Sequence, residues 1–291
     1  MKRVLLILFC IIANCLLCSA QTTLYYPHVA NGVLGGTVWK TTIFLANPAS
    51  TGTASGTVTL TRDNSTLGGA GSAFSTIAFS DENGAPAGSG GTITFSIPPG
   101  QSRKYTSTGA GAYAGGFATV ATTAGTVTGT AIFSEFDLAG RLIGEAGVPS
   151  AAAVPNQAIF VDTQGGFNVG VAYANPGTGS ASIELSLLNS AAASVATTTQ
   201  VLGPGNHVAG FTSQMFPGAP QLAGTMQIRS TAPLAAIALR FDPSFTVFTT
   251  LPPITLASLI PSTVEWLERQ QWATPLKSVA RLLSTFYSSR V

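Results

Sequence analysis

Apolar and polar residues alternate along much of the chain, and this period of two constrains the fold most strongly. In residues 182–187, isoleucine and leucine alternate with serine and glutamate, and residues 92–97 and 225–229 follow the same pattern. This period puts apolar side chains on one face of an extended strand and polar side chains on the other. Antiparallel sheets with one buried face are built from such strands, so the sequence predicts an all-β fold.

Short motifs recur in the same order in the two halves of the chain. An Asn-Pro pair ends an apolar run at Asn47-Pro48 and again at Asn175-Pro176, and a Pro-Gly pair follows at Pro99-Gly100 and at Pro204-Gly205. Proline and glycine at these places indicate turns between strands. The spacing between the motifs is longer in the first copy, which predicts an insertion at about 63–91, either an extra hairpin or a long loop.

The repeat predicts two tandem antiparallel β-sandwich modules of the immunoglobulin-like type, because about seven short strands fit in each copy. The expected organisation is a signal peptide at 1–20, module 1 at 21–148, module 2 at 155–256 and a partly helical tail at 257–291. The segment Gly144–Asn156, rich in glycine, proline and alanine, is the predicted linker. The cysteine pair and core tryptophan of immunoglobulin domains are missing from both copies, which leaves the sandwich topology open.

The first twenty residues have the pattern of a secretory signal peptide. Two basic residues precede an apolar run at Val4–Leu17, and small residues follow at 18–20. Cleavage after Ala20 predicts an exported protein, extracellular or at the cell surface, with the periplasm as an alternative. Cys15 follows a sequence that resembles a lipobox, so lipidation of Cys15 is a second alternative.

Cysteine use and charge narrow the expected partners. All three cysteines lie within the predicted signal peptide, so the mature chain would have no disulfide and would depend on its core. Between residues 21 and 260, seven Lys and Arg residues nearly balance nine Asp and Glu residues. Nucleic-acid binding needs clustered basic side chains to neutralise phosphates, so no nucleic-acid partner is expected. No later apolar run is long enough to span a membrane.

Residues of the types that carry catalysis are scattered. His28 and His207 are the only histidines, and they do not match between the copies, which predicts a structural or surface role for each rather than a zinc site. The acidic turn Asp81–Gly84 lacks the last acidic ligand of an EF-hand loop, so a plain turn is expected there. A Gly-x-Ser-x-Gly nucleophile elbow is also missing. The sequence therefore predicts no catalytic residue, no cofactor and no metal.

Two groups of residues are candidate ligand sites. Glu135 matches Asp242 across the copies and is the one acidic position that they share. Acidic residues at strand ends usually accept hydrogen bonds in turns, and a hydrolase would need a second titratable group facing one of them. Tyr25, Tyr26 and Trp39 lie early in module 1 and form a candidate sugar-binding platform, although aromatic residues on strands more often fill cores.

The tandem pattern resembles exported bacterial proteins built of immunoglobulin-like repeats. The resemblance rests on the Asn-Pro motif at one strand end and on Pro-Pro-Gly or Gly-Pro-Gly before another, and it spans residues 24–256. It implies no catalytic residues. The expected function is a non-enzymatic exported structural, adhesive or assembly module that presents a β-sandwich surface to other surface proteins or to polysaccharide. The alternatives are a carbohydrate-binding module and a secreted hydrolase.

Overall fold

The computed structural model describes residues 23–245 and 247–257. The predicted signal peptide, Cys15 and nearly all of the predicted tail lie outside these residues. The described chain is almost entirely β-structure, and all pairings between its named strands are antiparallel, which confirms the predicted all-β class. None of the helices in these residues has the length and hydropathy needed to cross a membrane.

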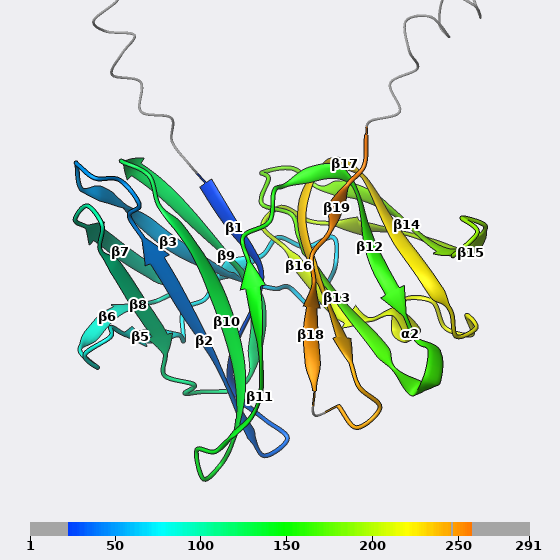
Figure 1. The fold of residues 1–291 in the computed structure, drawn as a ribbon, viewed down its shortest axis with the longest axis horizontal. Helices are drawn as coiled ribbons and strands as arrows, with labels where there is room; N and C mark the ends of the chain where they lie inside the picture. Colours follow the sequence, from blue (N-terminus) through cyan, green and yellow to red (C-terminus); the bar gives the residue numbers. More distant parts are fainter. Residues whose placement is uncertain (1–22, 246, 258–291) are drawn as a thin grey trace, which may run out of the picture. The chain divides into compact units, whose positions relative to one another are not determined.

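Within residues 23–149 the strands form one sheet, and part of that sheet closes on itself (Figure 1). The pairing order β1-β9-β3-β7-β6-β5-β8-β2 returns to its start, because β1 also pairs with β2, while β10 and β11 extend from β2. The strands are β1 (Thr23–Leu34), β2 (Thr37–Ala46), β3 (Ala54–Arg62), β4 (Ser72–Ala73), β5 (Ala78–Ser80), β6 (Pro86–Ser89), β7 (Thr92–Ile97), β8 (Ser102–Ser107), β9 (Ala114–Ala124), β10 (Thr128–Asp137) and β11 (Leu142–Pro149).

The insertion predicted at 63–91 closes this ring. It contains a hairpin in which β5 pairs with β6, and the hairpin joins β8 on one side to β7 on the other. Phe74, Ile77 and Phe79 of the insertion are buried and belong to the core of this half. An immunoglobulin-like sandwich has two separate sheets with open edges, so a closed ring is not the arrangement that the sequence predicted for residues 21–148.

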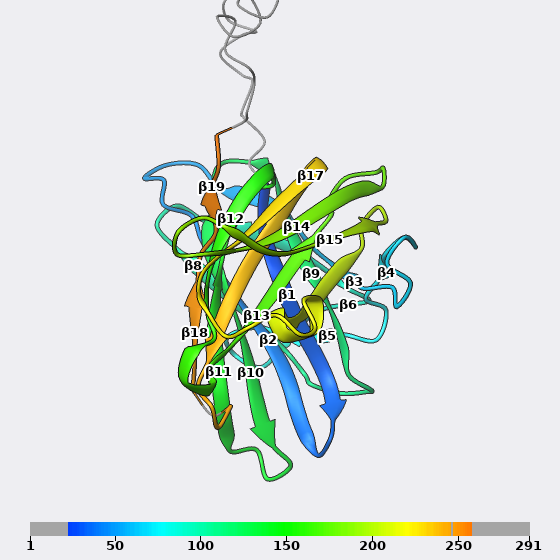
Figure 2. The same ribbon diagram turned by 90° about the vertical axis from the view of Figure 1, so that its right-hand side faces the viewer.

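The second half of the described chain is organised around one long strand. The first part of β17 pairs with β12 and β14, and its last part pairs with β13 and β18, so a single strand runs through two groups of strands (Figure 2). These pairings show antiparallel sheets, but they do not establish the immunoglobulin-like topology predicted for residues 155–256. The elements are β12 (Val154–Asp162), the 3₁₀ turn η1 (Gln164–Gly166), β13 (Asn168–Ala174), β14 (Ala181–Asn189), β15 (Ser194–Leu202), β16 (His207–Phe211), α2 (Thr212–Met215), β17 (Ala223–Phe241), β18 (Phe248–Leu251) and β19 (Ile254–Thr255).

The alternating residues fill the cores as expected. Ile183, Leu185 and Leu187 are buried in the core of the second half, while the serine and glutamate between them face outward. The core of the first half continues beyond its own strands, because Ile237 and Leu239 of β17 belong to it. The described residues up to 256 accordingly group into one unit, and β11 and β12 occupy most of the segment predicted as a linker.

The asparagines of the repeated Asn-Pro motif are buried and hold turns in place. Asn47 exchanges backbone hydrogen bonds with the turn at 99–101, and Asn175 does so with the turn at 204–206. The side-chain amide of each asparagine also donates to nearby backbone carbonyls and its oxygen accepts from a backbone N–H two residues on. A buried amide with this many partners stabilises the turn, because its polar groups leave water without losing hydrogen bonds.

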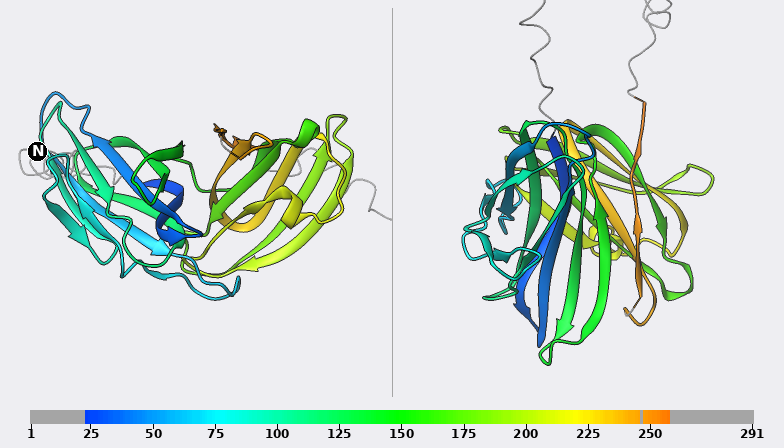
Figure 3. Two further views of the ribbon diagram at one scale, coloured as in Figure 1. Left: turned by 90° about the horizontal axis from the view of Figure 1, so that it is seen from below. Right: turned by 60° about the vertical axis from the view of Figure 1, so that its left-hand side comes forward.

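A further buried asparagine, Asn206, joins the two halves, which lie side by side in Figure 3. The side-chain oxygen of Asn206 accepts from the backbone N–H of Asn64 at 2.8 Å, and its amide group donates to the carbonyls of Thr66 and Leu67 at 3.2 and 3.0 Å. Backbone hydrogen bonds between residues 67–71 and 203–204 add to this contact. The start of the insertion therefore packs against the β15–β16 turn of the other half.

Candidate binding pocket

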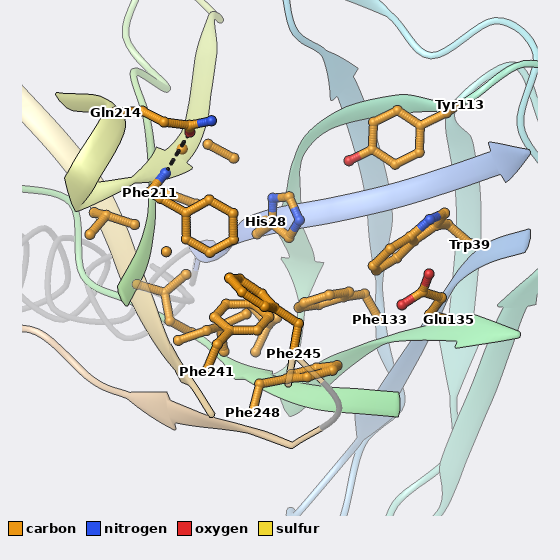
Figure 4. A pocket seen from close by; sticks show the side chains of 18 residues that line it. His28, Trp39, Tyr113, Phe133, Glu135, Phe211, Gln214, Phe241, Phe245 and Phe248 are labelled. Carbon is orange, nitrogen blue, oxygen red and sulfur yellow. Dashed lines mark hydrogen bonds between the residues drawn. The ribbon is translucent and has the colours of Figure 1, made fainter. Parts of the chain in front are cut away.

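A cavity of about 380 Å³ lies where strands of the two halves meet (Figure 4). Its volume falls in the range of roughly 300–1,000 Å³ that is usual for small-molecule sites. Small residues and a valine at 170–172 and 209–210 form part of the wall. Most of the remaining wall is aromatic, with Trp39, Tyr113 and Phe133 from the first half and Phe211, Phe241, Phe245 and Phe248 from the second.

Strand register explains why these side chains meet. Phe133 and Glu135 are two residues apart in β10, so they point to the same face, and Glu135 lies directly opposite Trp39 of β2. Phe241 at the end of β17 lies opposite Phe248 at the start of β18 in the same way. Each half therefore contributes a cross-strand pair to the cavity.

The aromatic rings form a continuous stack across the two halves (Figure 4). Trp39 stacks on Phe133 with ring centroids 5.8 Å apart, Phe133 on Phe248 at 5.9 Å, and Phe248 on Phe241 at 5.1 Å. Gly144 makes room for this stack, since a Cβ at that position would lie 2.5 Å from the Phe248 ring. Offset aromatic stacks of this kind bury much apolar surface and hold their rings in fixed positions.

The two histidines, 179 residues apart in sequence, meet at the edge of the cavity. His28 lines the cavity, and its Nδ1 lies 3.3 Å from Nε2 of His207. His207 is fully buried, and its Nδ1 is 3.8 Å from a carboxylate oxygen of Asp63. Burial, together with the charge of His207, lowers the pKa of His28 to about 3, so His28 is neutral at ordinary pH. The sequence predicted separate structural or surface roles for these residues, whereas the structure brings them together.

Three further polar groups stand in the cavity wall, on Glu135, Trp39 and Gln214. The carboxylate of Glu135 has no hydrogen-bond partner within residues 23–245 and 247–257. The indole Nε1 of Trp39 is buried and likewise finds no hydrogen-bond acceptor in the part of the chain that the structure describes. The side-chain oxygen of Gln214 accepts from the backbone N–H of Phe211 at 2.9 Å. Few polar side chains thus face a largely apolar volume.

The residues singled out by the sequence fall in different places. Trp39 and Glu135, which belonged to separate candidate sites, share this cavity. Tyr26 is fully buried in the core, where burial raises the pKa of its hydroxyl, and Tyr25 is only partly exposed on the opposite face of β1. The three aromatic residues therefore do not form one exposed platform. Asp242 is not in the cavity wall; it closes the turn before β18 by accepting from the backbone N–H of Val247 at 2.8 Å.

Sequence reasoning missed the phenylalanines of the second half and the histidine pair. One signal was present, because three phenylalanines fall between residues 241 and 248. The histidine pair had no such signal. Groups of three or more residues able to hold a metal are not found among the described residues. No protein-family model matches this chain, and no curated protein is significantly similar to it.

Proposed function

We propose that this protein is a non-enzymatic exported module whose function is binding, and that the cavity holds a small, mainly apolar ligand with a ring-shaped body. The aromatic stack from Trp39 to Phe241, which lines a cavity of about 380 Å³, is the observation that carries this proposal. A planar ligand would replace water against ring faces that are already fixed by packing. Removing apolar surface from water contributes about 25 cal/mol per Å².

The aromatic lining also bears on the two roles expected from the sequence. Polysaccharide recognition needs exposed ring faces surrounded by many hydrogen-bonding groups, while this cavity offers few polar side chains. A structural or adhesive role remains compatible with a ligand that occupies the junction between the halves. The proposal therefore favours a compact apolar ligand over a sugar chain.

Filling the cavity provides the direct test. Ala209 lies in the wall, so Ala209→Trp would occupy the ligand volume, whereas Ala193→Trp places the same side chain in the exposed β14–β15 turn. Binding of one- and two-ring aromatic compounds would be measured by calorimetry. We expect Ala209→Trp to weaken binding at least tenfold, by roughly 1.4 kcal/mol or more, and Ala193→Trp to leave it unchanged. Equal binding by Ala209→Trp and the unmodified protein would contradict the proposal.

One observation favours a second candidate, the secreted hydrolase. Glu135 and His28 line the same cavity, so an acidic and a basic group face one space. Carboxylate and imidazole side chains are the groups that most often carry general acid–base catalysis. The test is hydrolysis of a panel of esters and glycosides: activity that is lost in Glu135→Gln while folding is retained would establish this candidate, and an inactive purified protein would remove it.

We further propose that the two halves are copies of one immunoglobulin-like module. Their strand orders support this: β1-β9-β3-β7 corresponds to β12-β17-β14-β15, and β8-β2-β10-β11 corresponds to β16-β13-β17-β18. On this proposal the hairpin β5–β6 is an addition to the first copy. The matching hydrogen bonds of Asn47 and Asn175 agree with it.

We also propose that the protein is exported. On the same proposal, it belongs to a group of bacterial proteins with tandem immunoglobulin-like repeats. The signal-peptide pattern supports export. Intact-mass measurement of the secreted protein should give Gln21 as the first residue. A diacylglycerol mass on Cys15 would establish the lipoprotein alternative instead.

A further inference from the structure

A chain of three polar side chains leads from the surface into the cavity. Asp63 lies next to His207, with its carboxylate oxygen 3.8 Å from Nδ1, and Nε2 of His207 lies 3.3 Å from Nδ1 of His28. His28 lines the cavity, while His207 is fully buried behind it. The contact between the rings is a hydrogen bond, so one imidazole donates and the other accepts.

The carboxylate of Asp63 decides which imidazole donates. Nδ1 of His207 is buried and has no hydrogen-bond partner among the described residues, and the nearest charge to it is the Asp63 carboxylate. A proton on Nδ1 is attracted to that negative charge, whereas a lone pair there would be repelled by it. His207 therefore carries its proton on Nδ1, and its Nε2 accepts.

The tautomer of His28 follows from the same geometry. Because Nε2 of His207 accepts, Nδ1 of His28 must be the donor, and the neutral ring of His28 then has a lone pair on Nε2. Nε2 of His28 has no hydrogen-bond partner in residues 23–245 and 247–257. The carboxylate of Glu135 in the same cavity can also only accept when ionised.

We propose that Asp63 and His207 fix His28 as a hydrogen-bond acceptor, and that the cavity therefore selects ring-bearing ligands that carry a donor, such as a hydroxyl, an N–H or an ammonium group. This proposal rests on the proposed binding function and names the class of ligand. The aromatic walls hold the ring body, and the acceptors select the group attached to it. A donor that reaches His28 replaces the water that would otherwise satisfy its lone pair, whereas an ether or methyl group leaves that lone pair unsatisfied.

Nitrogen-15 NMR tests the tautomers without any ligand. The sequence has two histidines, so histidine-labelled protein gives four ring-nitrogen signals that can be assigned completely. We expect a protonated Nδ1 and an unprotonated Nε2 on both rings at neutral pH. An Nε2–H tautomer of His28, or a His207 ring protonated on both nitrogens, would overturn the proposal, since either would make His28 a donor towards the cavity.

A matched pair of probes tests the ligand class. 2-Naphthol and 2-methoxynaphthalene share one ring body, and only the first has an O–H donor. We expect calorimetry to show about tenfold tighter binding of 2-naphthol, and the preference to fall below about twofold in His28→Phe. Equal affinity of the two compounds for the unmodified protein would overturn the donor selection and leave the proposed function standing. Binding of neither compound would contradict both.

Asp63 acts on the ligand only through His207, so a variant of Asp63 is tested by the tautomers of the histidines as well as by binding. Asp63→Asn should change the nitrogen-15 pattern of both rings and reduce the 2-naphthol preference, while the affinity for 2-methoxynaphthalene stays within about twofold. Asp81→Asn is the control, because Asp81 is an aspartate of the first half that accepts hydrogen bonds from backbone N–H groups of its own turn and is not in the cavity wall. An Asp63→Asn protein that keeps the preference and the nitrogen-15 pattern would show that Asp63 does not set the tautomer.

Discussion

The two halves of the molecule differ in how the edge strands of their sheets are paired. In the first half, the hairpin β5–β6 fills the space between β7 and β8 and closes a ring. In the second half, β15 pairs with β14 alone among the described strands. An unpaired strand edge is a template for association with another chain. The two halves therefore differ in whether this edge of the sheet is open to such association.

The same insertion also supplies the contact between the halves. Its first residues, 63–71, bind the turn around Asn206, and Asp63 comes to lie beside His207. One segment of the first half, residues 63–91, therefore closes a sheet, joins the halves and completes the polar chain that reaches the cavity.

Removing the apolar anchor of the hairpin should have the largest effect. Phe79 is 2% exposed in β5, and Phe79→Ala should lower the free energy of unfolding by about 3–5 kcal/mol, because it leaves a cavity in the core. Urea denaturation measures the loss. Phe160→Ala is the control, since Phe160 of β12 is 53% exposed, and it should cost less than about 1 kcal/mol. Similar losses for both variants would show that ring closure adds little to stability.

Breaking the contact between the halves should have the next largest effect. Asn206→Ala removes one acceptor and the two N–H donors of one amide group from a buried site and leaves the Asn64 N–H unsatisfied, which should cost about 3 kcal/mol. Limited proteolysis should then cut residues 64–71 faster. Asn189→Ala is the control, because Asn189 makes its side-chain hydrogen bonds within its own turn. If Asn206→Ala is cut at the same rate as the unmodified protein, the insertion docks without the help of this side chain.

Acidification tests the histidine contact between the halves. His28 has a pKa of about 3 in the folded protein and an ordinary value of 6.5, so between these values the unfolded chain binds a proton that the folded chain does not. Stability therefore falls as the pH drops below 6.5, by about 2 kcal/mol between pH 6.5 and pH 5. Thermal unfolding across this range measures the loss.

The variant His28→Gln is the control for this pH dependence and should lose most of it. Asp137 does not interfere, since hydrogen bonds from Arg141 and the turn hold the pKa of Asp137 below its usual value near 3.8, and its contribution is lost only at lower pH. If the stability of the unmodified protein and that of His28→Gln depend on pH in the same way, titratable groups other than His28 cause the loss of stability.

The open edge of the second half should give the smallest change in stability. Val201 of β15 is 47% exposed, and Val201→Lys should alter the free energy of unfolding by less than about 0.5 kcal/mol while reducing self-association, because a charged edge disfavours strand pairing between chains. Light scattering against concentration measures association. Leu138→Lys is the control, since Leu138 is more exposed but lies in a turn. If Leu138→Lys decreases association more than Val201→Lys does, the turn between β10 and β11 mediates association rather than the β15 edge.

Local features of the sequence determined the strands and turns. The alternation at 182–187 predicted both the strand and its buried face, and the Asn-Pro motifs at Asn47 and Asn175 marked turns that the structure holds with equivalent hydrogen bonds. Spacing between motifs also predicted an insertion at 63–91, the segment in which the structure has the hairpin β5–β6. These features were accessible because the period of a strand and the φ preferences of proline and glycine act over a few residues.

Tertiary structure decided the closure of the ring, the aromatic cavity and the histidine pair. The sequence predicted an extra hairpin or a long loop in the insertion, but not which edges a hairpin there would join, because an edge strand can pair with any compatible edge. It gave Trp39 and Glu135 as separate candidates, and only the register between β2 and β10 put them side by side. His28 and His207 meet across 179 residues, a distance over which sequence pattern carries no pairing information.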